Sequence, residues 1–311
     1  MVWLHVRHPE RLGPAQIPTG AKVSTRLEDI LEDTSVQGVL VLTPPNTHLE
    51  IIQSLARAGK HVLVEKPLDI NLSRATTLVE TCETHGVVLA VMLQHRMREA
   101  ATTLRALLTS GELGQLISAS MNVRWWRPQS YYDEPGRGTW ARDGGGVLMT
   151  QAIHTLDLLL SFTQMPQRVM GSISTSALHH METEDTAAAL LYGADGAVVT
   201  LQATTAAYPG FSERIELNCT QGSATLEGGA LQVSLLNGKT VSLGAARTTG
   251  GGVDPMAFDH GPHRTVLQDF IRAIRQGDAP AVTGRSALGA QQVIEAIVRS
   301  SQTGAMVTLL P

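Results

Sequence analysis

The feature that most constrains the fold is an alternation of short apolar runs with amphipathic segments in the first hundred residues. The apolar runs at residues 39–42, 61–64 and 87–92 predict buried strands. The segments between them carry apolar residues at helical spacing, and Gly59 and Gly86 end them. Strands that alternate with helices favour a parallel sheet with helices packed on it. We therefore expect a βαβαβ unit here.

Beyond residue 115 the pattern changes to long alternating strands, at residues 116–127 and 186–205, with a hairpin turn at 192–196. Long strands without helices between them favour an antiparallel sheet. Two helices, at residues 262–276 and 287–302, close the chain, and the glycines at 250–252 predict a loop. We therefore expect an α/β domain over residues 1–110 and an α+β domain over residues 111–311.

Composition excludes several classes of function. The 24 Lys and Arg residues against 28 Asp and Glu give a charge of −4, which excludes the broad basic surface of a nucleic-acid binder. No apolar run approaches the roughly 18 residues that a membrane span needs, and the N-terminus does not resemble a signal peptide. Cys82 and Cys219 fit no metal-ligand spacing. We expect a cytoplasmic protein without a metal site.

Polar loops follow the three predicted parallel strands, at residues 43–48, 65–67 and 94–96. Ligands bind outside the carboxyl ends of such strands, so all three loops should face one crevice. Lys66 is constrained by the proline that follows it, and a constrained ammonium can polarise a carbonyl or donate a proton. The alternative is a surface lysine that pairs with Glu65.

A second candidate region is a glycine-rich entry at residues 144–146 and the apolar segment at 147–162, which predicts a buried helix. The polar residues of this helix gather in one stripe: Thr150, Gln151, His154 and Asp157. A buried polar group without a partner costs about 1 to 3 kcal/mol, so each needs a protein or ligand partner. His154 suits general acid or base chemistry at neutral pH. The alternative is a structural histidine anchored by Asp157.

Residues 124–142 hold five of the twelve aromatic residues together with four arginines. Flat rings beside donor-rich side chains suit sugar rings and anionic groups such as carboxylate or phosphate. Arg124 and Tyr132 are candidate substrate contacts in this stretch. The alternative is an ordered surface loop or an oligomer contact.

These motifs together resemble the glucose-fructose oxidoreductase and inositol dehydrogenase family (Gfo/Idh/MocA). The resemblance rests on the segments 43–48, 58–67 and 140–157, and it runs from about residue 9 to the C-terminus. It implies a dinucleotide-binding Rossmann domain followed by a domain with a large, mostly antiparallel sheet. It also implies a homodimer or homotetramer formed through the C-terminal sheet.

The resemblance implies hydride transfer between NAD or NADP and a hydroxyl of a sugar, nucleotide sugar, cyclitol or related compound. Lys66 would lie near the reacting hydroxyl, His154 would donate or accept the proton, and Asp157 would support the site. Many members carry Asp where this chain has Thr150, whereas Gln151 resembles a branch that acts on sugars and nucleotide sugars. Residues expected along the cofactor are Thr43, Pro44, Asn46, His48, Glu65, Gln94, Trp140 and Arg142.

One departure concerns the cofactor, because the family's GxGxxG turn occurs nowhere in this sequence. Residues 2–6 look like the family's second strand, so we expect a truncated Rossmann-like domain without the first βα unit and with a sheet edge or gap there. The sequence start could be internal, or the chain could hold its cofactor weakly or not at all. An oxidoreductase is the leading hypothesis. The alternatives are a cofactor-free binding or scaffold protein and an NAD-assisted glycosidase.

Overall fold

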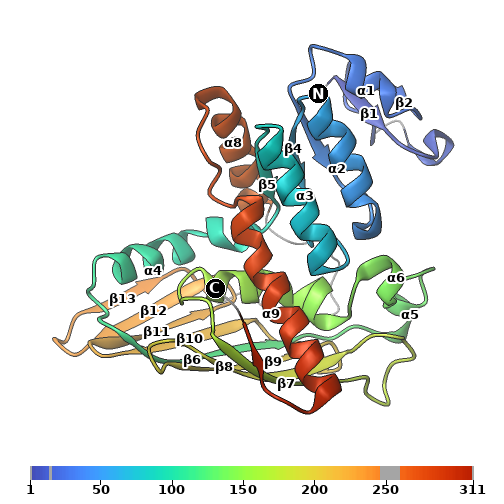
Figure 1. The fold of residues 1–311 in the computed structure, drawn as a ribbon. Coiled ribbons are helices and arrows are strands. Elements are labelled where there is room, and N and C mark those ends of the chain that lie inside the picture. Colours follow the sequence, from blue (N-terminus) through green and yellow to red (C-terminus); the bar gives the residue numbers. More distant parts are fainter. Residues whose placement is uncertain (1, 14–15, 246–259, 310–311) are drawn as a thin grey trace.

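The computed structural model describes residues 2–13, 16–245 and 260–309, so the loop predicted at 250–252 lies outside the described residues. Figure 1 shows the two parts of the chain, with small parallel sheets and their helices standing on one face of a large sheet. The long helix α9 (Gly284–Thr303) runs from the upper part down to the large sheet. The predicted combination of α/β and α+β architecture is confirmed.

The N-terminal part contains two small parallel sheets. The strands predicted around residues 39–42, 61–64 and 87–92 are confirmed as β3 (Gly38–Val41), β4 (His61–Val64) and β5 (Leu89–Val91), which form one three-stranded sheet. The strands β1 (Trp3–His5) and β2 (Lys22–Ser24) form a separate pair. Within the described residues β1 does not pair with β3, so β3 is an edge strand of its sheet.

Helices pack on the three-stranded sheet because its strands are apolar on both faces. Val62, Leu63 and Val64 of β4 are fully buried, and α8 (Gly261–Gln276) covers the face that carries Leu63 through Val266 and Phe270. The remaining helical segments of this part are η1 (Pro9–Arg11), α1 (Glu28–Glu32), η3 (Pro45–Thr47), α2 (His48–Arg57), α3 (Leu72–Thr84) and η4 (Gln94–Met97).

In the described part of the chain, the large sheet has nine strands in the order β13-β12-β11-β10-β6-β9-β8-β7-β14. Only the β6–β9 pair is parallel, so the expected mostly antiparallel sheet is confirmed. The strands are β6 (Leu116–Arg124), β7 (Arg168–Ser174), β8 (Thr186–Tyr192), β9 (Val198–Thr204), β10 (Arg214–Cys219), β11 (Gly222–Glu227), β12 (Ala230–Leu235), β13 (Thr240–Leu243) and β14 (Val307–Thr308). The hairpin predicted at residues 192–196 joins β8 and β9.

Helices cover one face of this sheet and leave the other open (Figure 1). Ala119, Met121 and Val123 of β6 face the helices and are buried, because alternate residues of a strand point to opposite faces. The helical segments on this side are α4 (Glu99–Thr109), α5 (Gln129–Tyr132), α6 (Trp140–Asp143), the π-helical turn η5 (Leu148–Ala152) and α7 (Ile153–Leu160). Helix α4 lies at the end of the expected 1–110 domain, where the pattern predicted no element.

Helix α9 contacts β7, α3 and α7, and so connects the large sheet with the parallel-sheet part. Thr283 caps its first turn and Gly304, in the left-handed conformation, ends it. Buried residues of both parts form one continuous apolar cluster. The division at residue 110 therefore stays a prediction. None of the helices in the described ranges is long and apolar enough to cross a membrane.

Candidate active site

Lys66 connects the two parts of the predicted site. It follows strand β4, and its Nζ donates a hydrogen bond of 2.6 Å to the backbone carbonyl of Thr150. Thr150 lies in the π-helical turn η5, directly before the helix α7 that carries His154. Such turns interrupt the regular helical hydrogen-bond ladder and are frequent at functional sites. The structure thus brings together two candidate regions that lie 84 residues apart in the sequence.

Burial and neighbouring charges shift the acidity of both groups. Burial lowers the pKa of Lys66, Arg137 lowers it further, and the carboxylates of Glu65 and Asp143 oppose the shift. The pKa of His154 lies well below 6.5, first because of burial and then because Lys66 is close to it. His154 is therefore neutral at pH 7, and a neutral imidazole can accept a proton.

Several buried polar atoms of η4 and α7 have no hydrogen-bond partner among the described residues. They include Nδ1 of His154 and Oε1 of Gln94 in η4, a segment that contacts α7. A buried polar atom without a partner costs about 1 to 3 kcal/mol, and such atoms are rare in folded proteins. These atoms fit a site that accepts a bound polar molecule, and the amide and sugar groups of a nicotinamide cofactor supply such partners.

Thr150 and Gln151 extend the site toward the aromatic stretch. Gln151 Nε2 donates to the hydroxyl of Tyr131 at 3.3 Å, and Arg137 Nη1 donates to the same hydroxyl at 2.8 Å. Thr150 Oγ1 lies 2.7 Å from the Gly146 carbonyl and 2.5 Å from Gln151 Oε1. Tyr131 and Arg137 were missed as individual residues in the sequence analysis, because nothing in the pattern distinguishes Tyr131 from its neighbour.

Two expected substrate contacts are corrected by the structure. Tyr132 is 7% exposed, and its hydroxyl pairs with Thr205 Oγ1 at 2.7 Å, so its ring belongs to the core. Burial raises the pKa of this tyrosine. Arg124 is exposed and lies over the ring of Phe211, 4.0 Å from its centroid. Arg124 alternates with the buried Val123, so it belongs to the open face of the sheet, opposite the helices.

His48 is also corrected, from a cofactor contact to a structural residue. Its side chain is fully buried. Nε2 lies 2.8 Å from the carbonyl oxygen of Thr43, and Nδ1 lies 3.1 and 3.0 Å from those of Pro67 and Leu68. Because its ring nitrogens meet backbone carbonyls, His48 ties the loop after β3 to the loop that carries Lys66.

Asp157 pairs with Arg96 and not with His154, the partner considered in the sequence. Its carboxylate is 1% exposed and forms a two-pronged ion pair with Arg96, in which Arg96 Nε lies 2.7 Å from Oδ2 and Nη2 contacts Oδ1. It makes no described hydrogen bond to His154, whose Nδ1 is unpaired. Asp157 therefore fixes η4, the segment that carries Gln94 and Arg96.

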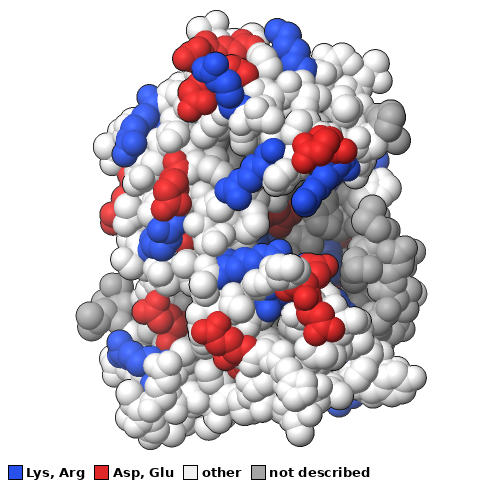
Figure 2. All heavy atoms as spheres, turned by 90° about the vertical axis from the view of Figure 1, so that its right-hand side faces the viewer, with Lys and Arg blue, Asp and Glu red and all other residues white. Residues whose placement is uncertain are grey.

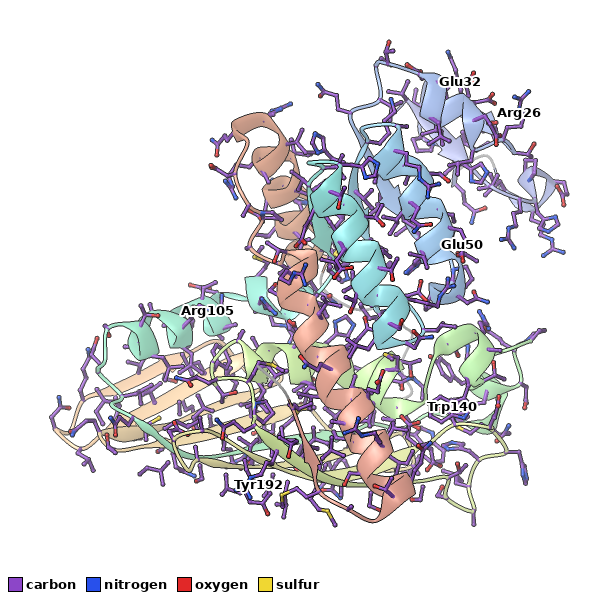
Figure 3. The ribbon with its side chains drawn as sticks, in the orientation of Figure 1. Arg26, Glu32, Glu50, Arg105, Trp140 and Tyr192 are labelled. Atoms are coloured by element: carbon purple, nitrogen blue, oxygen red, sulfur yellow. The ribbon has the colours of Figure 1, made fainter. Side chains whose placement is uncertain are left out.

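The expected cofactor contacts lie at the carboxyl ends of the three parallel strands and on α6. Thr43, Pro44 and Asn46 follow β3, Glu65 follows β4, and Gln94 follows β5. Helix α6, which carries Trp140 and Arg142, packs against η3 in the loop after β3. Figure 3 shows Trp140 below the parallel-sheet part, and Figure 2 shows that the surface is hollowed on this side of the molecule.

The glycine-rich entry at residues 144–146 serves close packing. A Cβ atom on Gly146 would lie 1.7 Å from the carbonyl oxygen of Glu184, and one on Gly144 would lie 2.2 Å from that of Ile70. The buried carboxylate of Glu184 accepts hydrogen bonds from the backbone amides of Gly146 and Leu148, at 2.9 and 3.0 Å. These contacts fix the start of the segment that positions Thr150 and His154.

Sequence comparison identifies both parts of the chain. A family model described as "Oxidoreductase family, NAD-binding Rossmann fold" matches residues 3–93, and the model of the GFO/IDH/MocA C-terminal domain matches residues 101–225. The scyllo-inositol 2-dehydrogenase (NADP(+)) IolW of Bacillus subtilis is 24% identical over 303 residues, which cover 91% of this chain and 81% of that protein.

The uncharacterized oxidoreductase C115.03 of Schizosaccharomyces pombe is 30% identical over 168 residues, 52% of this chain, and the match spans less than half (44%) of that relative's length. The WlbA dehydrogenase from Bordetella pertussis, crystallised in complex with NADH and UDP-GlcNAcA, has a similar structure, with a TM-score of 0.84 and 27% identity over 100% of this chain and 91% of that chain. Together with the two family models, these similarities confirm the resemblance: the chain belongs to the Gfo/Idh/MocA family of oxidoreductases with an NAD-binding Rossmann fold.

Proposed function

We propose that the protein is an NAD(P)-dependent dehydrogenase or reductase that transfers a hydride between the nicotinamide and a CH–OH group of a sugar, nucleotide sugar, cyclitol or related compound. The observation that carries this proposal is the contact of the Lys66 ammonium with the Thr150 carbonyl, one helical turn before His154. It gathers a cation and a neutral imidazole beside unpartnered polar atoms at the carboxyl ends of parallel strands.

In this proposal Lys66 and His154 have different roles toward the alcohol group of the substrate. The Lys66 ammonium hydrogen-bonds the reacting oxygen and stabilises the negative charge that develops on it. The neutral His154 accepts the hydroxyl proton in the oxidation and returns it in the reduction. The cofactor, when bound, would supply the hydride acceptor for the oxidation.

The side chains beside this pair suit a polyhydroxylated substrate. Gln151, Thr150 and Tyr131 present an amide and two hydroxyl groups at the site, and the Arg137 guanidinium lies over the Tyr131 ring, 4.3 Å from its centroid. The relatives named for UDP-GlcNAcA and scyllo-inositol support a substrate of this class. We assign the cofactor to the loops after β3, β4 and β5 and to α6, through Thr43, Pro44, Asn46, Glu65, Gln94, Trp140 and Arg142.

The test replaces the two reacting side chains by neutral residues of similar size. Lys66→Met and His154→Gln should each lower kcat about a hundredfold or more, as removal of an acid-base group commonly does. Lys239→Met and His85→Gln, at exposed positions, serve as matched controls and should keep the wild-type kcat. Wild-type turnover in both site variants would refute the assignment.

Two further experiments test the two alternative functions, one by cofactor binding and one by hydrolysis of a glycoside. Calorimetric titration with NAD, NADH, NADP and NADPH should show binding of at least one of them. No heat with any of the four would favour a cofactor-free binding or scaffold protein. Release of free sugar from a glycoside without net reduction of the cofactor would favour an NAD-assisted glycosidase.

We also propose that the protein forms a homodimer or homotetramer through the open face of the nine-stranded sheet. Met170 and Leu190, directly opposite each other on β7 and β8, are 37% and 38% exposed on this face.

We also propose a cytoplasmic location. The thiols of Cys82 and Cys219 are both free and buried, and reduced cysteines are typical of cytoplasmic proteins.

A further inference from the structure

A second histidine packs against the proposed acid-base residue. His95 lies in η4 and His154 in α7, and their rings are stacked with centroids 5.0 Å apart and planes inclined by 29°. His95 is only 5% exposed. One face of the His154 ring is therefore covered by another flat ring rather than by water.

Arg98 fixes the hydrogen-bonding state of His95. The Nη2 of Arg98 lies 2.7 Å from Nε2 of His95. A guanidinium can only donate hydrogen bonds, so Nε2 must accept, and the single ring hydrogen of His95 is on Nδ1. A protonated His95 would place two donors against each other. His95 is therefore neutral in this arrangement.

Arg98 is itself held from the large sheet. Its Nη1 donates to Oε1 of Glu213 at 2.6 Å, and the Glu213 side chain, just before β10, is buried. A charge-assisted hydrogen bond of this kind restrains the guanidinium strongly. The contacts thus form one chain from Glu213 through Arg98 and His95 to the ring of His154.

We infer that His95 is a positioning residue for His154. Arg98 fixes the plane of the His95 ring, and that ring closes one face of His154 and restricts its rotation. The inference rests on the proposed function, because it assumes that His154 transfers a proton there. It assigns to His95 and Arg98 a role that acts through the ring contact with His154 and the hydrogen bond between them.

The groups around His154 explain how this contact also controls its protonation. Lys66 faces it from the loop after β4, His95 and Arg98 from η4 and its end, and His263 from α8. One turn further along α7, Asp157 is neutralised by Arg96. Lys66, His95, Arg98 and His263 each lower the pKa of His154. The neutral imidazole of His154 is therefore favoured in two ways. The His95 ring shields it from water, and the neighbouring groups disfavour a positive charge on it.

Two substitutions separate the ring contact from the hydrogen bond to Arg98. His95→Gln keeps an acceptor for Arg98 but removes the ring, so water reaches His154. We expect the pKa of His154, measured by NMR titration of its imidazole, to rise by about one unit or more as burial is relieved. The acid limb of kcat/KM should move to higher pH with it, and kcat should fall about tenfold with KM unchanged, as expected for a misplaced proton acceptor.

His95→Phe is the matched control, because it keeps the ring and removes the acceptor. It should leave the titration of His154 and the acid limb of the pH profile as in the wild type. An unchanged His154 titration in His95→Gln would overturn the inference. An equal shift in His95→Gln and His95→Phe would also overturn it, because the ring contact would then have no special effect.

A measurement on the wild type keeps the inference testable if His95→Gln does not fold. The nitrogen chemical shifts of His95 should show the hydrogen on Nδ1 at neutral pH. A hydrogen on Nε2, or a doubly protonated His95, would overturn the inference. These spectra do not depend on turnover, so a wild type without any dehydrogenase activity would refute the proposed function and leave the stacking inference to the NMR result.

Discussion

Three histidines of this chain differ in what their ring nitrogens contact. Both nitrogens of His48 lie against backbone carbonyls, and those of His179 lie against Asp185 and the Arg127 carbonyl. His154 instead has a buried Nδ1 without a partner in the described part of the chain. A histidine whose hydrogen bonds are all made by the protein holds structure, whereas an unsatisfied one can serve a bound molecule.

The two stacked histidines should make stability depend on pH. The pKa values of His95 and His154 in the folded protein lie well below 6.5, mainly because of burial. The unfolded chain then binds more protons below pH 6.5, so the free energy of unfolding should decrease as the pH falls, by at most about 1.4 kcal/mol per pH unit for each histidine. Urea unfolding at pH 7, 6 and 5 measures this slope.

The matched variants for this prediction are His154→Gln and His85→Gln. The first should reduce the slope between pH 6.5 and 5, because one depressed group is gone. The second, at an exposed position, should leave the slope as in the wild type. An identical slope in wild type and His154→Gln would contradict the prediction.

We expect the loss of the buried Arg96–Asp157 ion pair to lower the free energy of unfolding much more than the loss of an exposed ion pair does. Asp157→Ala leaves a buried guanidinium without its partner and should destabilise the protein by about 3 to 5 kcal/mol. Glu83→Ala breaks the exposed pair with Arg285 and should cost less than about 1 kcal/mol. Denaturant unfolding at pH 7 compares the two, and equal losses would show that the pair at α7 does not fix η4 as we describe.

At the scale of elements, the approach of the segment 144–152 to Glu184, just before strand β8, decides where the site residues lie. The amides of Gly146 and Leu148 bind the Glu184 carboxylate, and the amide of Val147 donates to the Glu184 carbonyl at 2.8 Å. Gly146 has no side chain, and only this permits its backbone to reach Glu184. The position of His154 therefore depends on a packing contact two turns away.

Gly146→Ala should consequently be strongly destabilising. Its Cβ would lie 1.7 Å from a backbone oxygen, so the two segments must separate, and we expect a loss of about 2 kcal/mol or more with a large loss of activity. Gly13→Ala is the control, because the nearest atom to its Cβ is 3.6 Å away. Thermal unfolding checks both, and a Gly146→Ala protein with wild-type stability would contradict the packing described here.

At the scale of the whole molecule, the two faces of the large sheet differ in what covers them. Helices cover the upper face in Figure 1, and the lower face, where Tyr192 lies in Figure 3, is open. The exposed apolar side chains of this face include Met170, Leu190 and Val198. An open sheet face with exposed apolar side chains favours association with another copy of the chain.

Charged substitutions test this proposed interface. Met170→Asp and Leu190→Asp should shift the sedimenting species from dimer or tetramer to monomer, because an interface disfavours a buried unpaired charge. Ile271→Asp, at a 45% exposed residue of α8 outside the large sheet, should keep the wild-type assembly. A wild-type protein that sediments as a monomer would refute the interface.

The amino-acid sequence by itself determined the elements and the class of each part. The apolar runs at 39–42, 61–64 and 87–92 predicted the three parallel strands, because backbone repeat and burial leave a local period in the sequence. Because Lys66 and Gln94 closely follow two of these runs, the sequence also predicted that they lie at strand ends. The separate β1–β2 pair leaves β3 at a sheet edge, as expected from the departure at residues 2–6, whereas α4 went unpredicted.

Only the tertiary structure decided which of these residues meet. Lys66 and Thr150 are 84 residues apart, and no local period relates them. The side of the sheet that Arg124 takes, the choice of Tyr131 over Tyr132, and the pairing of Asp157 with Arg96 all depend on how helices pack against strands. These contacts follow from the shape of the whole core, because burial selects side-chain partners only after distant segments have come together.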